Sequence, residues 1–258
     1  MFRVLSLVLV VASSTTATAS ERDCNELGLK QAFSPMWVQE VKACFLYTET
    51  DTQQMNQLSR EPDGISVYSL SGSKKFTLVY DFPYAGTRAE IDDAFFISVD
   101  EYDEMLFVIH RVETPSSWDA VSDLYDVGVM KIKGGVLVKD QALSRFFDLG
   151  GDLVDPQGKL SFIYPYKDKR SVENAVRSPL FRTVSSSSLI RGTINEKTFL
   201  YGGDAEPAVQ DPSKKYLIKG DQVSVEDSVA GWCKVSYATN AKTISMWVQC
   251  KSIVFTSN

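Results

Sequence analysis

His110 is the single histidine of this 258-residue chain, and it limits the catalytic chemistry that the sequence can support. It ends the apolar run M-L-F-V-I-H (105–110), where an imidazole is more often packed than reactive. A Ser–His–Asp site would have to use His110, and the chain has no G-x-S-x-G nucleophile elbow. A catalytic zinc site usually needs at least two histidine ligands. We therefore expect no catalytic residues, no metal site and no cofactor.

Clustered carboxylates leave one catalytic alternative open. Two carboxyl groups about 5–10 Å apart could hydrolyse a glycosidic bond, and sequence alone does not give that distance. These clusters lie in expected turns, where acidic side chains commonly bond their own backbone. The segment D-L-G-G-D-L-V-D (148–155) lacks the spacing of an EF-hand calcium loop. The clusters are Asp92-Asp93, Asp100-Glu101, Asp103-Glu104, and Asp148 with Asp152 and Asp155.

Four cysteines, none of them in a C-x-x-C motif, are expected to form two disulfides: Cys24–Cys44 and Cys233–Cys250. Three connectivities are possible for four cysteines, and the sequence favours this one. A hairpin of residues 232–238 and 245–251, centred on residues 241 and 242, would place Cys233 opposite Cys250 at a distance that suits a bridge. A thiol hydrolase built on Cys44 and His110 is disfavoured, because Cys44 is expected to be oxidised.

The first 19 residues have the features of a secretory signal peptide. Arg3 provides the positive charge, Val4 to Ala12 are apolar, and A-T-A (17–19) fits a cleavage site. The apolar run is much shorter than the roughly 20 residues of a transmembrane helix. We expect a mature chain in the periplasm or secreted, with no membrane insertion after cleavage.

The formal net charge of −6 is unevenly distributed. Residues 20–190 carry 18 basic and 26 acidic side chains, whereas residues 191–258 carry eight and seven. An acidic surface repels nucleic acid and anionic lipid and suits a basic protein partner, although such charge also serves solubility. No nucleic-acid partner is expected.

The hydrophobic pattern predicts a mainly β protein that begins with a helical hairpin. Residues 21–60 have apolar side chains at mixed three-to-four spacing, with a break at Pro35, which predicts two short helices. Alternating runs then predict an antiparallel β-rich region, whose topology stays open between a sandwich and a barrel-like sheet. Its expected parts are strands at 65–70, 75–80, 94–99 and 105–112, a hairpin over 127–140 around Gly134-Gly135, a strand at 160–166 and a helix at 169–183.

The serines at 185–188 indicate a boundary, and the chain after it resembles the bacterial SH3 (SH3b) domain. The resemblance rests on four segments and covers about a quarter of the chain. They are T-F-L-Y-G-G-D (198–204), Y-L-I-K-G-D-Q-V-S-V (216–225), G-W-C-K-V-S-Y (231–237) and S-M-W-V-Q-C-K-S-I-V (245–254). The resemblance implies a β-barrel over residues 190–258 after a first domain over 20–185.

The resemblance also implies a binding groove lined by aromatic side chains, with Tyr201 and Trp232 near it and Tyr216 and Tyr237 available to it. Trp247, of the family's W-V pair, is expected in the barrel core. Partners of such modules are cell-wall peptides or other proteins.

The expected function is therefore binding to a protein partner without catalysis. An exported, acidic, disulfide-bonded chain without evident catalytic residues fits the profile of a periplasmic immunity protein that neutralises a basic secreted toxin. Peptidoglycan binding by the C-terminal module is the first alternative. A carboxylate-dependent hydrolase is the second.

Overall fold

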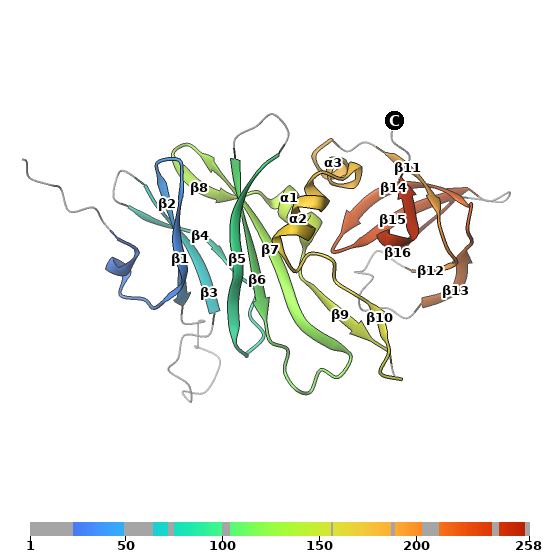
Figure 1. Cartoon of the computed structure of the whole chain (residues 1–258), viewed down its shortest axis with the longest axis horizontal. Helices are drawn as coiled ribbons and strands as arrows, with labels where there is room; N and C mark the ends of the chain where they lie inside the picture. The colour runs from blue at the N-terminus through green and yellow to red at the C-terminus, as the bar shows by residue number, and fades with distance from the viewer. Residues whose placement is uncertain are drawn as a thin grey trace, which may run out of the picture.

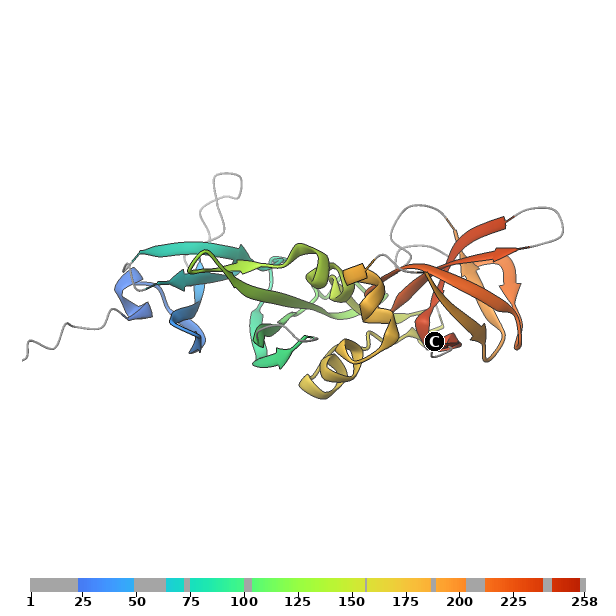
Figure 2. The ribbon, with the colours of Figure 1, turned by 90° about the horizontal axis from the view of Figure 1, so that it is seen from above.

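Three antiparallel sheets follow one another along the long axis of the molecule, and three helices lie between the second and the third (Figures 1 and 2). This computed structural model describes residues 23–48, 64–71, 75–99, 104–155, 157–186, 189–202, 212–238 and 243–255. The expected signal peptide at 1–19 lies outside the described residues. No helix of the described part is long and apolar enough to span a membrane.

The first sheet corrects the prediction of an N-terminal helical hairpin. Its strands, in the order β1-β2-β3-β4, follow a short 3-10 helix, η1 (Cys24–Leu27). Residues 49–60 of the predicted helical segment lie outside the described part of the chain. The strand bounds are β1 (Gln31–Val38), β2 (Val41–Thr48), β3 (Gly64–Leu70) and β4 (Phe76–Asp81).

Two features made these strands look helical in the sequence. Pro35 lies in β1, an edge strand whose pairing with β2 is interrupted by register shifts, and such strands tolerate proline. β2 is buried on both faces, so its apolar residues do not alternate with polar ones. A tight turn at Gln39, with φ of +56°, joins Val38 to Val41 as facing partners.

The second sheet is the central layer and has the order β10-β9-β7-β6-β5, with β8 paired to β7. Gly134 and Gly135 have positive φ and form the expected turn between β7 and β8. The bounds are β5 (Ala89–Ser98), β6 (Glu104–Val112), β7 (Val121–Lys133), β8 (Val136–Lys139), β9 (Gly150–Val154) and β10 (Leu160–Phe162).

Three helices pack beside this layer: α1 (Gln141–Phe147), α2 (Lys169–Val176) and α3 (Pro179–Ser186). The Asp140 carboxylate caps α1 by accepting a hydrogen bond from the Leu143 amide. The Asp168 carboxylate caps α2 in the same way, with a hydrogen bond from the Ser171 amide. The sequence predicted one helix over 169–183, whereas the structure has two, and it did not predict α1.

The third sheet contains the strands that the structure describes after α3, in the order β13-β12-β16-β15-β14-β11-β17. A short 3-10 helix, η4 (Cys250–Ser252), separates the last two strands. The strand bounds are β11 (Ile190–Ile194), β12 (Thr198–Tyr201), β13 (Pro212–Leu217), β14 (Gln222–Val229), β15 (Trp232–Ala238), β16 (Thr243–Gln249) and β17 (Ile253–Phe255).

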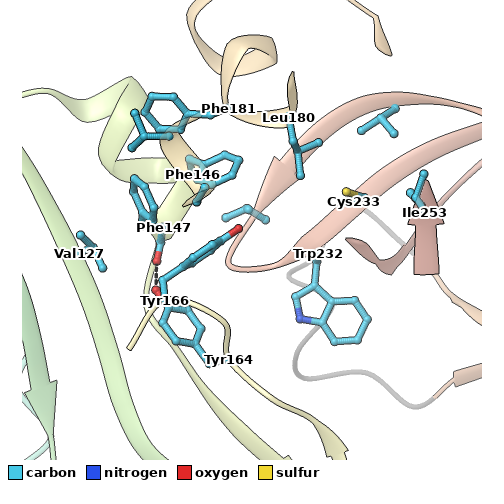
Figure 3. Close-up of a cluster of buried hydrophobic side chains, with 14 of the residues drawn as sticks. Val127, Phe146, Phe147, Tyr164, Tyr166, Leu180, Phe181, Trp232, Cys233 and Ile253 are labelled. Carbon is cyan, nitrogen blue, oxygen red and sulfur yellow. Dashed lines mark hydrogen bonds between the residues drawn. The ribbon is translucent and has the colours of Figure 1, made fainter. Parts of the chain in front are cut away.

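The two faces of the central sheet belong to different cores. In β6, Leu106 and Val108 pack with the first sheet, whereas Phe107 and Ile109 pack with the helices. The second core continues without a break into the third sheet, and Figure 3 shows its aromatic rings between the two sheets. The Tyr164 hydroxyl donates a hydrogen bond to the Phe147 carbonyl inside it. The division into domains at 20–185 and 190–258 stays a prediction.

Both expected disulfides are present, Cys24–Cys44 and Cys233–Cys250. The geometry of the second differs from the expected hairpin, because Cys233 faces Val248 rather than Cys250. Cys250 lies just beyond β16, in η4, and its Cα is 5.0 Å from that of Cys233. Two disulfides are consistent with a protein that folds in an oxidising compartment.

Candidate functional site

The outer face of the third sheet carries three of the four aromatic residues predicted for a groove. Alternation along the strands places Trp232, in β15, on the face opposite Cys233, which points into the core. The Tyr201 ring packs edge-on against Trp232, with centroids 4.7 Å apart. Tyr216 pairs with Phe199 across β13 and β12. Tyr237 alternates onto the other face, where it packs against the core, so the structure does not bring it to the others.

Trp232 is covered by the chain itself. Its side chain is 1 % exposed, and the Phe162 ring of β10 stacks on it with centroids 4.8 Å apart. The Gln249 amide beside it donates a hydrogen bond of 2.9 Å to the Ser161 carbonyl of the same strand. Trp247, expected in the barrel core, is buried, but it pairs with Tyr201 and so lies on the same face as Tyr201. The indole N–H groups of Trp232 and Trp247 have no hydrogen-bond partner within the described residues.

Phe199 and Tyr216 form the exposed part of this aromatic face. Their side chains are 45 % and 51 % exposed, and their rings meet edge to face with centroids 6.3 Å apart. The Lys197 ammonium lies 4.3 Å from the Tyr216 ring centroid and 5.4 Å from that of Phe199. This contact keeps one positive charge on an apolar surface.

A shallow cavity of about 270 Å³ opens beside the pair. Its walls combine two ammonium groups, one carboxylate, one amide and two aromatic rings, a mixture that suits a ligand with both polar and apolar groups. Burial raises the pKa of the Tyr201 hydroxyl at its edge. The lining residues are Ser161, Glu196, Lys197, Thr198, Phe199, Tyr201, Gln249, Lys251 and Ser252.

The sequence analysis did not identify Phe199 and Lys197 as residues of this site. It also did not predict that β10 contributes Ser161 to the cavity and Phe162 to the cover of Trp232. Phe199 could have been found, because it stands two residues before Tyr201 and so shares its face in a strand. The contact between Phe162 and Trp232 has no local signal, since 70 residues separate the two rings.

The single histidine is not available to a substrate. His110 is fully buried between the first and second sheets and stacks on Phe82, with ring centroids 4.5 Å apart. Neither ring nitrogen has a hydrogen-bond partner within the described residues. Burial lowers the pKa of this imidazole to about 3. A neutral, enclosed imidazole fits packing rather than acid–base catalysis.

A buried carboxylate lies near the same interface. Asp126, on β7, faces His110 across the pair of strands and accepts a hydrogen bond of 3.2 Å from the Tyr80 hydroxyl. The Lys139 ammonium lies over the Tyr80 ring, 3.3 Å from its centroid. Burial raises the pKa of Asp126 and lowers that of Lys139. Tyr80 therefore contacts both the buried carboxylate and the partly buried ammonium.

Several carboxylates of the acidic clusters have structural partners. The Arg111 guanidinium binds Asp92 and Asp123, each at 3.1 Å, and also Glu90. The Asp152 carboxylate binds the Lys167 ammonium at 2.6 Å. Within the described residues, no group of three or more His, Cys, Asp or Glu side chains could hold a metal ion. Asp100, Glu101 and Asp103 lie outside them.

All four cysteines are consumed by the two disulfides, so Cys44 has no free thiol for nucleophilic catalysis. The aromatic and cationic face of β12 and β13 lies beside the cavity, and it is the surface that we consider for binding. Comparison with known proteins adds no family to this description: a scan of protein-family models, a search of curated proteins and a search of solved structures each gave no match.

Proposed function

We propose that this chain is an exported binding protein, in the periplasm or secreted, that acts by contact with another protein and not by catalysis. The observation that carries the proposal is the exposed Phe199–Tyr216 pair, which lies beside a cavity and under the ammonium of Lys197. Aromatic side chains on a rigid strand supply large contact areas at little entropic cost, and they dominate many protein interfaces.

Three further observations support this proposal. The imidazole of His110 is enclosed, the cysteines are oxidised, and the described carboxylates at Arg111 and Lys167 are ion-paired. The resemblance of residues 190–258 to SH3b modules supports a binding role for this end of the chain. Neutralisation of a secreted antibacterial toxin is the form of this role that we favour.

The test is a pull-down from periplasmic extract with the mature chain as bait and with purified sacculi as a separate bait. We expect one stoichiometric protein that the double variant Phe199→Ser/Tyr216→Ser fails to capture. Trp118→Ser is the matched control, because Trp118 is 47 % exposed and lies outside this face. A protein retained equally by both variants would contradict the proposal.

The experiment with sacculi distinguishes binding to a protein from binding to peptidoglycan, which is the main alternative. Retention on sacculi that is lost in the Phe199→Ser/Tyr216→Ser variant, with no protein captured, would make this a wall-binding protein. A captured protein with no retention on sacculi would support the proposed role and make the partner's own activity the next quantity to assay.

A further inference from the structure

Three lysines stand at or near the aromatic face of the third sheet, although the chain as a whole has a formal charge of −6. Lys197 and Lys251 line the cavity, and both are exposed. Lys214 stands two residues before Tyr216 in β13, and its side chain is exposed. None of the three forms an ion pair with a carboxylate of the described residues.

Carboxylates that could neutralise these lysines are few within the described part of this region. Among the described residues that line the cavity, Glu196 is the single carboxylate. The Asp221 carboxylate accepts a hydrogen bond of 2.9 Å from the Ile218 amide within the turn before β14. Lys197 directly precedes β12, which carries Phe199, and the neighbouring strand β13 carries the exposed Lys214 and Tyr216.

We infer that this face binds an acidic polypeptide segment whose carboxylates reach Lys197, Lys214 and Lys251 while an apolar side chain packs on Phe199 and Tyr216. The inference rests on the proposed function and specifies the chemistry of the partner at this face: an acidic segment here, in place of the basic partner that the net charge of the chain predicts. Complementary charge steers such a segment to the face, and aromatic contact retains it.

A polypeptide fits the cavity better than a polyanion does. The Glu196 carboxylate and the Gln249 side-chain carbonyl are acceptors, and they match the backbone N–H groups of a peptide, which a phosphate group does not have.

The test uses the full mature chain and a fluorescein-labelled peptide in which glutamate and phenylalanine alternate. Fluorescence anisotropy should show binding that weakens as salt is added. Lys197→Glu/Lys214→Glu should weaken it by about tenfold or more, because two attractive pairs become repulsive. Lys133→Glu is the matched control, since Lys133 is exposed at the distant end of β7 and should leave binding unchanged. Equal melting temperatures of the variants would show that folding is intact.

Companion probes give the outcomes that would overturn the inference. A peptide with lysine in place of glutamate, or alanine in place of phenylalanine, should not bind. Tighter binding of oligothymidylate or of phosphatidylglycerol vesicles than of the acidic peptide would assign the face to a polyanion instead. No binding of the acidic peptide, or binding that charge reversal leaves unchanged, would also overturn it.

The two proposals fail separately. If a protein is captured through Phe199 and Tyr216 but is indifferent to Lys197→Glu/Lys214→Glu, the chemistry inferred for the partner is wrong and the protein-binding role stands. If no protein is captured, the protein-binding role fails, whatever the synthetic peptide does.

Discussion

The Phe162 ring lies on the indole of Trp232, with centroids 4.8 Å apart and planes inclined by 21°. One ring comes from the short edge strand β10 of the central sheet, the other from β15 of the third sheet. Trp232, which the sequence predicted for a binding groove, is thus covered by another part of the same chain.

This stacking should contribute measurably to stability. We expect Phe162→Ala to lower the free energy of unfolding by about 3 kcal/mol, because a buried aromatic ring is lost and a cavity remains. Urea denaturation followed by tryptophan emission measures the change. Leu160→Ala is the control: Leu160 is in the same strand but 53 % exposed, and its loss should cost less than about 0.5 kcal/mol. Equal losses in both variants would show that the ring contact adds nothing specific.

The Cys233–Cys250 bridge should stabilise the full mature chain. Its sequence separation of 17 residues corresponds to about 3 kcal/mol in the chain-entropy model. We expect Cys233→Ser/Cys250→Ser to melt several degrees below the wild type under oxidising conditions. Reductant should lower the wild-type melting temperature and narrow that gap. Identical melting under oxidising conditions would refute a stabilising bridge.

His110 predicts a loss of stability in acid. Its pKa is about 3 in the folded chain and about 6.5 when exposed, so the unfolded chain binds the proton first as the pH falls. Folding therefore loses about 2 kcal/mol between pH 7.5 and pH 5 from this group alone. His110→Phe, which keeps a ring against Phe82, should remove that part of the pH dependence.

Asp126 acts in the opposite direction and provides the control. Its pKa is raised in the folded chain, so its stabilising effect is present at low pH and is lost as the pH rises through that value. Asp126→Asn should therefore steepen the loss of stability in acid. Unfolding free energies of the two single variants and the double variant, measured across this pH range, separate the two groups. An unchanged pH profile in His110→Phe would contradict the assignment.

The ion pair between α1 and β14 should be only modestly stabilising. The guanidinium nitrogens of Arg145 bind both carboxylate oxygens of Asp227 at 2.8 and 2.7 Å, and this hydrogen bonding lowers the pKa of Asp227. Because both side chains are partly exposed, a double-mutant cycle with alanine should give about 0.5–1 kcal/mol. The looser Lys169–Glu173 pair at 4.0 Å is the reference and should give about 0.3 kcal/mol. A coupling at Arg145 no larger than this reference would show that bidentate geometry adds nothing here.

Local sequence patterns predicted the strands at 65–70 and 127–140, but they did not predict β1 and β2 of the first sheet. Residues 65–70 and 127–140 alternate or carry a Gly-Gly turn, and the structure places strands there. β2 could not be recognised, because burial on both faces removes the alternation that identifies a strand. The helix α1 has only seven residues, and its capping Asp140 was read as the end of a strand.

Cysteine pairing was predictable, while the geometry of the site was not. The register of β15 and β16 depends on where the turn falls, and a shift of two residues places Val248 opposite Cys233. The contact of Phe162 with Trp232 depends on how two distant sheets pack, and neither residue's neighbours indicate it. The assignment of a binding role stays a prediction for Tyr201, Tyr216, Trp232 and Tyr237. The structure adds Phe199 to the aromatic residues that could take part.

The core that runs from the central sheet into the third sheet decides how binding can be mapped on this protein. The Ala230 amide bonds to the Phe146 carbonyl at 2.9 Å, and Phe162 covers Trp232, so the serines at 185–188 do not separate independent hydrophobic interiors. Deletion of residues 190–258 would remove apolar contacts from α1 and α3. Expression of residues 190–258 alone would expose the Trp232 indole to water. Lost binding after either deletion would report damaged folding, and single surface substitutions are the sound way to locate the interface.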